Sequence, residues 1–204
     1  MLKKIAAGLL ASLLSYGANP QLLCTLGSAR TYKQSADQRP SRDAMQLAGQ
    51  VNAAVRSICV PNCPSVMVLR NATAPNAILT VEAGQGKLVY SPAFFASVHD
   101  TFGDPGVVAI IAHEFGHALD DALGASWVQQ SWTPELRADA WAGCALGKSA
   151  LSATELQAAL DALAKYPSPS HPGWTVRLPV IRAGYAGCGG GSANFQSGNA
   201  RGRK

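Results

Sequence analysis

Two histidines, His113 and His117, lie four residues apart in an apolar stretch of the sequence. On an α-helix, residues four apart share a face and lie about 6 Å apart along the axis, so both imidazoles can bind one ion. Glu114 follows the first histidine directly, where it can take a proton from metal-bound water without binding the metal itself. This spacing predicts one zinc ion, Zn2+, per chain, with Glu114 as the general base.

A catalytic zinc ion has three protein ligands and an open position, so a third ligand is needed. The long form of the motif would have a glycine and a histidine at the positions that Asp120 and Leu123 occupy, and is excluded. Glu135 and Asp139 lie four residues apart further along the chain. We predict that Glu135 is the third ligand and that Asp139 accepts a hydrogen bond from the outer nitrogen of a ligand histidine. Alternatively, both carboxylates only stabilise a helix N-terminus.

The two histidines lie in the longest predicted helix, which begins near Asp104-Pro105 and ends at Gly124. An acidic cap followed by proline at the first helical position is typical of a helix start, and glycine of a helix end. The next predicted helix, from Thr133-Pro134 to Gly147, begins with the two carboxylates. The metal site is therefore expected between two consecutive helices.

A helix capped by Ser41 and ending before Pro61 precedes these elements. Its predicted apolar face consists of Met45, Leu47, Ala48, Val51, Val55 and Ile58. Strands are predicted at residues 65–70, 78–82 and 87–90, the last two joined by a hairpin turn at residues 83–86.

Two further helices complete the order of elements. Ser91-Pro92 begins a short one, and Ser152 and Glu155 form a capping box at the start of another, which ends before Pro167. One helix, a small sheet and then mostly helices make an α+β fold.

Length and composition favour one globular domain. The chain has 204 residues, 48% of them hydrophobic and 14% charged, and no apolar run reaches the roughly 18 residues of a membrane span. Of 17 Lys and Arg, five lie in the first four or last four residues, and the rest balance 12 Asp and Glu. Nothing therefore suggests a nucleic-acid surface.

The N-terminus has the layout of a signal peptide. Lys3 and Lys4 precede an apolar stretch that ends near Ala18, and we expect a leader over residues 1–29, with cleavage after Ala18 or Ala29. An uncleaved anchor is the alternative. We expect residues 30–188 to form an exported domain, periplasmic or secreted, with no stable membrane insertion once the leader is removed. Residues 189–204 form a Gly-rich basic tail expected to be disordered.

Five cysteines indicate disulfides in an exported chain. We predict one bridge between Cys144 and Cys188 and another between Cys59 and Cys63. The second pair could instead be half of a metal site, but no other pair has matching spacing. Cys24 lies in the leader and would be removed by cleavage after Ala29.

The chain resembles the gluzincin metallopeptidases. His113 to His117, followed by Glu135-Leu-Arg-Ala-Asp139-Ala-Trp-Ala-Gly143, is similar to the HtpX-like and CAAX prenyl-protease group and to bacterial neutral zinc metallopeptidases. Pro75-Asn76-Ala77 and His171-Pro172, with Arg177 six residues after the histidine, match further elements of the family. The resemblance covers residues 65–186, and the size without membrane spans is most like the soluble minigluzincins.

The resemblance implies a zincin-like fold in which an edge strand holds the substrate backbone over the metal. It also implies that His171 and Arg177 polarise the substrate carbonyl or stabilise its oxyanion. A capping histidine and an ion-pairing arginine are the alternative roles. Pro179 departs from the pattern and is expected to kink the last helix, which affects where Arg177 points.

We therefore expect a zinc-dependent metalloendopeptidase that acts on a peptide or protein substrate. Two other interpretations remain: a zincin-fold binding or chaperone-like module without turnover, and a latent proenzyme covered by the leader-proximal segment or the tail. The sequence identifies neither the substrate nor the oligomeric state.

Overall fold

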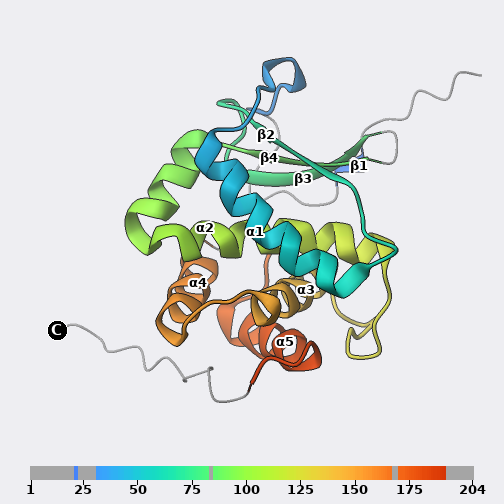
Figure 1. Cartoon of the computed structure of the whole chain (residues 1–204). Coiled ribbons are helices and arrows are strands. Elements are labelled where there is room, and N and C mark those ends of the chain that lie inside the picture. Colours follow the sequence, from blue (N-terminus) through green and yellow to red (C-terminus); the bar gives the residue numbers. More distant parts are fainter. Residues whose placement is uncertain (1–20, 23–30, 83–84, 167–169, 192–204) are drawn as a thin grey trace, which may run out of the picture.

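A computed structural model of the chain describes residues 21–22, 31–82, 85–166 and 170–191 (Figure 1). The expected leader apart from Gln21–Leu22, with Cys24, lies outside the described residues, as do positions 83–84 of the hairpin turn and the tail from residue 192. The elements are β1 (Gln21–Leu22), the 3-10 helix η2 (Gln34–Ala36), α1 (Arg42–Cys59), β2 (Val66–Arg70), β3 (Ala77–Glu82), β4 (Gln85–Tyr90), α2 (Pro92–Ala122), α3 (Pro134–Lys148), α4 (Ala153–Lys165) and α5 (Trp174–Gly187).

The strands form one small sheet in the order β1-β3-β4-β2. β3 and β4 are antiparallel, as the predicted hairpin requires, with Ala77 opposite Tyr90. β2 runs parallel to β4, and the two-residue β1 pairs antiparallel with β3. Together with the five helices, this sheet confirms the predicted α+β class.

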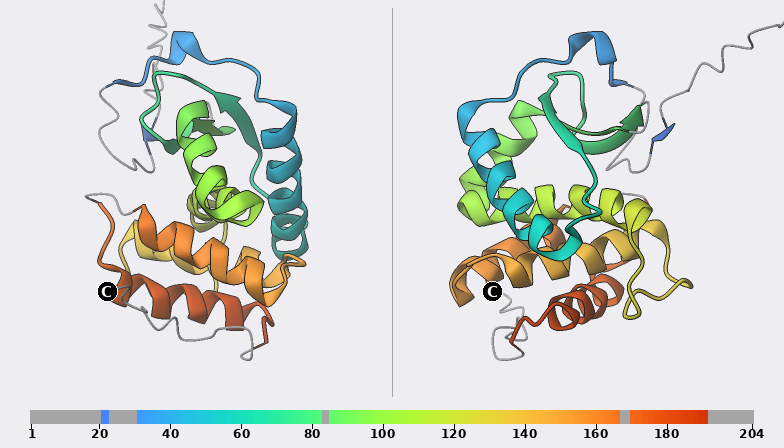
Figure 2. Two further views of the ribbon diagram at one scale, coloured as in Figure 1. Left: turned by 90° about the vertical axis from the view of Figure 1, so that its left-hand side faces the viewer. Right: turned by 45° about the vertical axis from the view of Figure 1, so that its right-hand side comes forward.

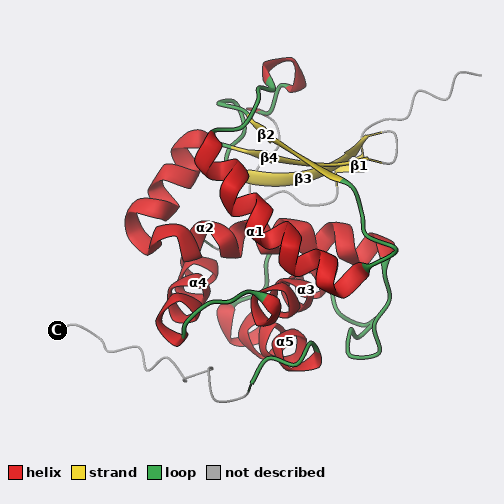
Figure 3. Cartoon of the chain, in the orientation of Figure 1, coloured by secondary structure: helices red, strands yellow, loops and turns green. Residues whose placement is uncertain are grey.

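The sheet lies at one end of the molecule and the helices fill the rest (Figures 1 and 3). The second half of α2 packs beneath β3 and β4 and contacts α3 and α4 on its other side. α5 packs on α3, and Figure 2 shows α5 on the side of the helical layer away from the sheet. α2 is thus covered by strands on one side and by helices on the other.

Side-chain caps fix where four of the described helices begin. At the starts of α1, α2, α3 and α4, a hydroxyl side chain accepts a hydrogen bond from the backbone N–H three residues later; these residues are Ser41, Ser91, Thr133 and Ser152. The capping box predicted between Ser152 and Glu155 is complete. These caps satisfy N–H groups that have no partner within their own helix.

The two helices predicted at Ser91 and Asp104 form one element, α2. Its bend lies at Gly103, which has φ 66° and ψ −166°, a conformation that a glycine adopts without steric cost. Beyond the bend, every residue from 106 to 119 is buried. A helix that is buried all round belongs at the centre of a domain, and this half carries His113, Glu114 and His117.

One expectation about α1 was wrong. Met45 is 50% exposed, because its side chain points about 120° away from the buried face of α1 that Leu47 and Val51 form. Pro179, which we expected to kink the last helix, lies inside α5, and the helix continues through it. Both Pro179 and Thr175, whose carbonyl loses its helical partner, are exposed, so water can take the place of the missing N–H.

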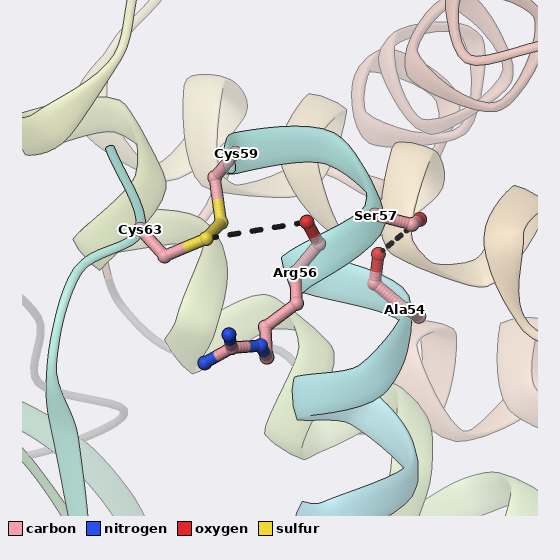
Figure 4. The surroundings of a disulfide bond; sticks show 5 residues. All are labelled: Ala54, Arg56, Ser57, Cys59 and Cys63. Atoms are coloured by element: carbon pink, nitrogen blue, oxygen red, sulfur yellow. Dashed lines mark hydrogen bonds between the residues drawn. A yellow bond between two sulfur atoms is a disulfide. The ribbon is translucent and has the colours of Figure 1, made fainter. Parts of the chain in front are cut away.

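Both predicted disulfides are present. Cys59 and Cys63 are joined at the end of α1, where the Cys63 Sγ also lies 4.0 Å from the Arg56 carbonyl oxygen (Figure 4). Cys144 in α3 is joined to Cys188, which directly follows α5, across 44 positions of sequence. Among the described residues, no helix has the length and apolar character to cross a membrane.

Candidate metal centre

Two histidines from α2 and one glutamate from α3 form a buried group that could hold a metal ion. The ligand atoms of His113, His117 and Glu135 all lie within 4.8 Å of one another. Glu135 Oε2 is 3.3 Å from His113 Nε2 and 3.5 Å from His117 Nε2. Two atoms bound to one tetrahedral ion at about 2.1 Å are about 3.4 Å apart, so these separations suit three ligands of zinc.

His117 supports this fit. Its side chain is 3% exposed, and its Nε2 has no hydrogen bond to any described residue; only the contact with Glu135 comes near. A buried imidazole nitrogen without a hydrogen bond costs free energy of folding unless another bond, such as one to a metal ion, satisfies it. Burial lowers the pKa of His117, against the opposing effect of Glu135, and so favours the neutral ring that a metal requires.

Asp139 lies directly behind His113. Its Oδ1 is 2.9 Å from His113 Nδ1, and because a carboxylate accepts, Nδ1–H donates and leaves Nε2 facing Glu135. Asp139 is fully buried. Burial alone would raise the pKa of Asp139, but hydrogen bonds from Arg177 and His113 hold it below its usual value. The carboxylate therefore stays charged behind the histidine.

Arg177 compensates that charge. Its Nε and Nη2 donate to the two oxygens of Asp139, each at 2.8 Å, and its Nη1 donates to the Leu163 carbonyl at 2.9 Å. Arg177 is 2% exposed, so this paired contact lies inside the protein. Arg177, Asp139 and His113 thus form a continuous chain of hydrogen bonds that starts at the end of α4.

The surroundings of Glu114 are unusual for a carboxylate. It is fully buried, and neither carboxylate oxygen has a hydrogen bond to a described residue. Burial, against the nearby charge of His113, raises the pKa of Glu114 to about 7. The backbone of Leu79 in β3 also lies near enough to oppose this rise, although the contact lacks the geometry of a full hydrogen bond.

His171 reaches the same place from the segment before α5. Its Nε2 lies 2.9 Å from Glu135 Oε2 and 3.1 Å from His113 Nε2, and its side chain is fully buried. Burial lowers the pKa of His171. Burial would raise the pKa of Glu135, but contacts with the three histidines hold it far below its usual value. Three imidazoles thus converge on one ionised carboxylate.

The fold brings together all seven residues selected from the sequence: His113, Glu114, His117, Glu135, Asp139, His171 and Arg177. His99 lies outside this centre: its side chain is more than half exposed and lies near Asp104. Leu163 and Leu79 could not be identified from the sequence, because each contributes through its backbone, and a backbone carbonyl or N–H carries no signature in residue type.

No protein-family model, curated protein or solved structure matches the chain. Its function is therefore inferred from the residues of the metal centre and their geometry.

Proposed function

We propose that this protein is an exported zinc metallopeptidase of the gluzincin type, with His113, His117 and Glu135 as ligands. One observation supports hydrolysis in particular: a buried carboxylate without a hydrogen-bond partner among the described residues, that of Glu114, directly follows a ligand histidine. A zinc ion that only stabilises a fold needs no such group, because its ligands complete the coordination. A base next to zinc-bound water does need one.

Each residue of the centre has a role in this reaction. Bound zinc would lower the pKa of a water molecule and polarise the scissile carbonyl. Glu114 would accept the proton of that water and deliver it to the leaving amine, because its buried carboxylate directly follows His113 and has no hydrogen-bond partner among the described residues. Asp139 holds the ring of His113 in the orientation that metal binding requires.

The resemblance gives His171 and Arg177 one role together, but in this proposal the two residues act in different ways. His171 lies against Glu135 and His113, close enough for its ring N–H to donate to an oxyanion formed beside the metal. All three guanidinium nitrogens of Arg177 donate hydrogen bonds to Asp139 or to the Leu163 carbonyl, so in this proposal Arg177 acts on the reaction only through Asp139. Alanine at His171 should therefore lower kcat more than zinc affinity, and alanine at Arg177 should lower zinc affinity first.

Two disulfides support export, because such bonds persist in oxidising compartments and are rare in the cytosol. Export in turn favours a peptide or protein substrate outside the cell membrane.

The direct test is metal analysis of the purified protein together with digestion of a random peptide library. We expect about one zinc per chain and cleavage that a chelator abolishes and added zinc restores. Zinc without cleavage, unchanged by any activation step, would favour a binding module. Absence of bound metal would contradict the proposal itself.

A latent precursor is the second candidate, favoured by the pairing of β1. Gln21 and Leu22 pair antiparallel with Val81 and Thr80 of β3, the strand whose Leu79 lies beside Glu114. A peptide substrate that adds as a strand would use the same edge. Proline at both Gln21 and Leu22 removes every backbone N–H that β1 could donate to this pairing, so the double variant should raise cleavage by the full chain if β1 blocks the site. An unchanged rate would argue against latency.

A further inference from the structure

The helices that carry the metal centre touch backbone to backbone at one position. A Cβ atom on Gly116 in α2 would lie 2.4 Å from the carbonyl oxygen of Ala138 in α3, and 3.0 Å from its Cα and its carbonyl carbon. Contacts below 3.0 Å are essentially never observed for real Cβ atoms. Because the opposing atoms are backbone, no side-chain rotation can relieve such an overlap.

This contact lies in the middle of the metal centre along both helices. Gly116 lies between His113 and His117, and Ala138 lies between Glu135 and Asp139. The separation of the two backbones here therefore sets how far Glu135 and Asp139 stand from the histidines. Zinc tolerates only about 0.2 Å of error in its bond lengths, so a small displacement of α3 matters.

We propose that Gly116 is a positioning residue for the metal, whose missing side chain lets α3 bring Glu135 and Asp139 within reach of the histidines. Any side chain at this position moves α3 outward. The 2.9 Å hydrogen bond between His113 and Asp139 and the 3.3 Å approach of Glu135 to His113 then lengthen together. The inference deepens the metal site of the proposed function but does not depend on hydrolysis.

Other glycines make similar contacts away from the ligands, which separates this role from helix packing in general. A Cβ on Gly106, in the same helix, would lie 2.5 Å from the Phe102 Cβ, and 3.2 to 3.3 Å from side-chain atoms of Val98 and Ala162. That contact involves α2 itself and α4, not α3. Gly106→Ala is therefore a matched control: the same change, in the same buried helix, with no effect on the spacing of α2 and α3.

The experiment measures zinc affinity by competition with a chromophoric chelator, and the visible spectrum of the cobalt-substituted protein, for wild type, Gly116→Ala and Gly106→Ala. Melting of each chelated protein reports fold stability separately. We expect Gly116→Ala to lose about 10- to 100-fold in zinc affinity and to change the cobalt spectrum. The zinc affinity of Gly106→Ala should stay within about threefold of the wild-type value, even if its metal-free form melts at a lower temperature.

Equal losses of affinity in the two variants, or unchanged affinity in Gly116→Ala, would show that Gly116 serves packing alone. If Gly116→Ala is poorly folded, the measurement is repeated with Gly49→Ala added, because Gly49 lies in α1 and a Cβ there would have no atom within 4 Å. Failure of that double variant to fold, even with zinc present, would also overturn the proposal. A wild type that binds no metal would contradict the proposed function instead.

Discussion

The Nδ1–H of His113 donates a 2.9 Å hydrogen bond to Asp139, a residue 26 positions later in the chain. This contact determines which ring nitrogen of His113 faces Glu135, because an imidazole that donates from Nδ1 presents Nε2 on its far side. Asp139 is in turn held by two hydrogen bonds from Arg177. The orientation of one ligand thus depends on helices α2, α3 and α5 together.

Weakening this chain of hydrogen bonds should weaken metal binding. We expect Asp139→Asn and Arg177→Ala each to lower zinc affinity by about 10- to 100-fold, measured by chelator competition. Arg137→Ala is the control, because it removes a similar 2.8 Å pair with Asp120 between the same two helices but away from the ligands. If Asp139→Ala abolishes zinc binding while Glu135→Ala retains it, the roles of these two carboxylates are exchanged.

Metal binding and catalysis should separate within one helix. His113→Ala, His117→Ala and Glu135→Ala each remove one of three ligands and should lose zinc and activity together. Glu114→Gln keeps the size of the side chain but removes the base, so it should bind about one zinc and hydrolyse peptides at least about 100-fold more slowly. Metal analysis and peptide cleavage on the same samples decide this. Full activity in Glu114→Gln would exclude the mechanism.

Zinc binding should release a proton at neutral pH. Burial lowers the pKa of His113, but hydrogen bonds to Asp139 and Glu135 outweigh it and raise the pKa to about 9 in the metal-free protein. Because this value lies above the ordinary 6.5, the proton stabilises the metal-free fold fully below about pH 6.5, and that contribution is lost as the pH rises through about 9. Zinc affinity should therefore increase with pH across this window.

Calorimetry in two buffers of different ionisation enthalpy measures the proton directly. About one proton per zinc is expected at pH 7, and fewer in Asp139→Asn, where the partner of the His113 proton is neutral. Zinc uptake without proton release in the wild type would contradict the raised pKa of His113.

The two disulfides should differ in their effect on stability. The Cys144–Cys188 bridge spans 44 positions and the Cys59–Cys63 bridge spans 4. In the chain-entropy treatment, losing the bridge that closes the long loop lowers the free energy of unfolding by about 3 to 4 kcal/mol. Losing the bridge that closes the short loop lowers it by about 2 kcal/mol. Denaturant unfolding of the two double alanine variants tests this order. Equal losses would indicate that unfolded-chain entropy is not the main contribution.

The contact between α3 and α5 should tolerate no added methyl group at Gly184. A Cβ there would lie 1.7 Å from the Ala140 carbonyl oxygen, so Gly184→Ala should destabilise the fold by about 2 to 3 kcal/mol. Gly49→Ala, with open space around it in α1, should instead stabilise by about 0.5 to 1 kcal/mol. Denaturant unfolding midpoints of the two variants measure these changes in stability. A stable Gly184→Ala protein would mean that the two helices can separate at little cost.

Local interactions made much of this protein predictable from its sequence. Caps such as Ser41 and Ser152 act within three residues, so the starts of α1 and α4 could be located without tertiary information. The same holds for His113 and His117, since a spacing of four residues on a helix places both rings on one face. The α+β class followed from the order of these elements.

Tertiary structure decided how segments distant in sequence meet. Whether Glu135 or Asp139 lies nearer the histidines depends on how α3 approaches α2. The spacing of the two carboxylates along α3 does not determine this approach. The position of Arg177 behind Asp139 likewise required the packing of α5 on α3. Sequence spacing determines which side chains share a face of one helix, whereas backbone contacts between helices determine which of those faces meet.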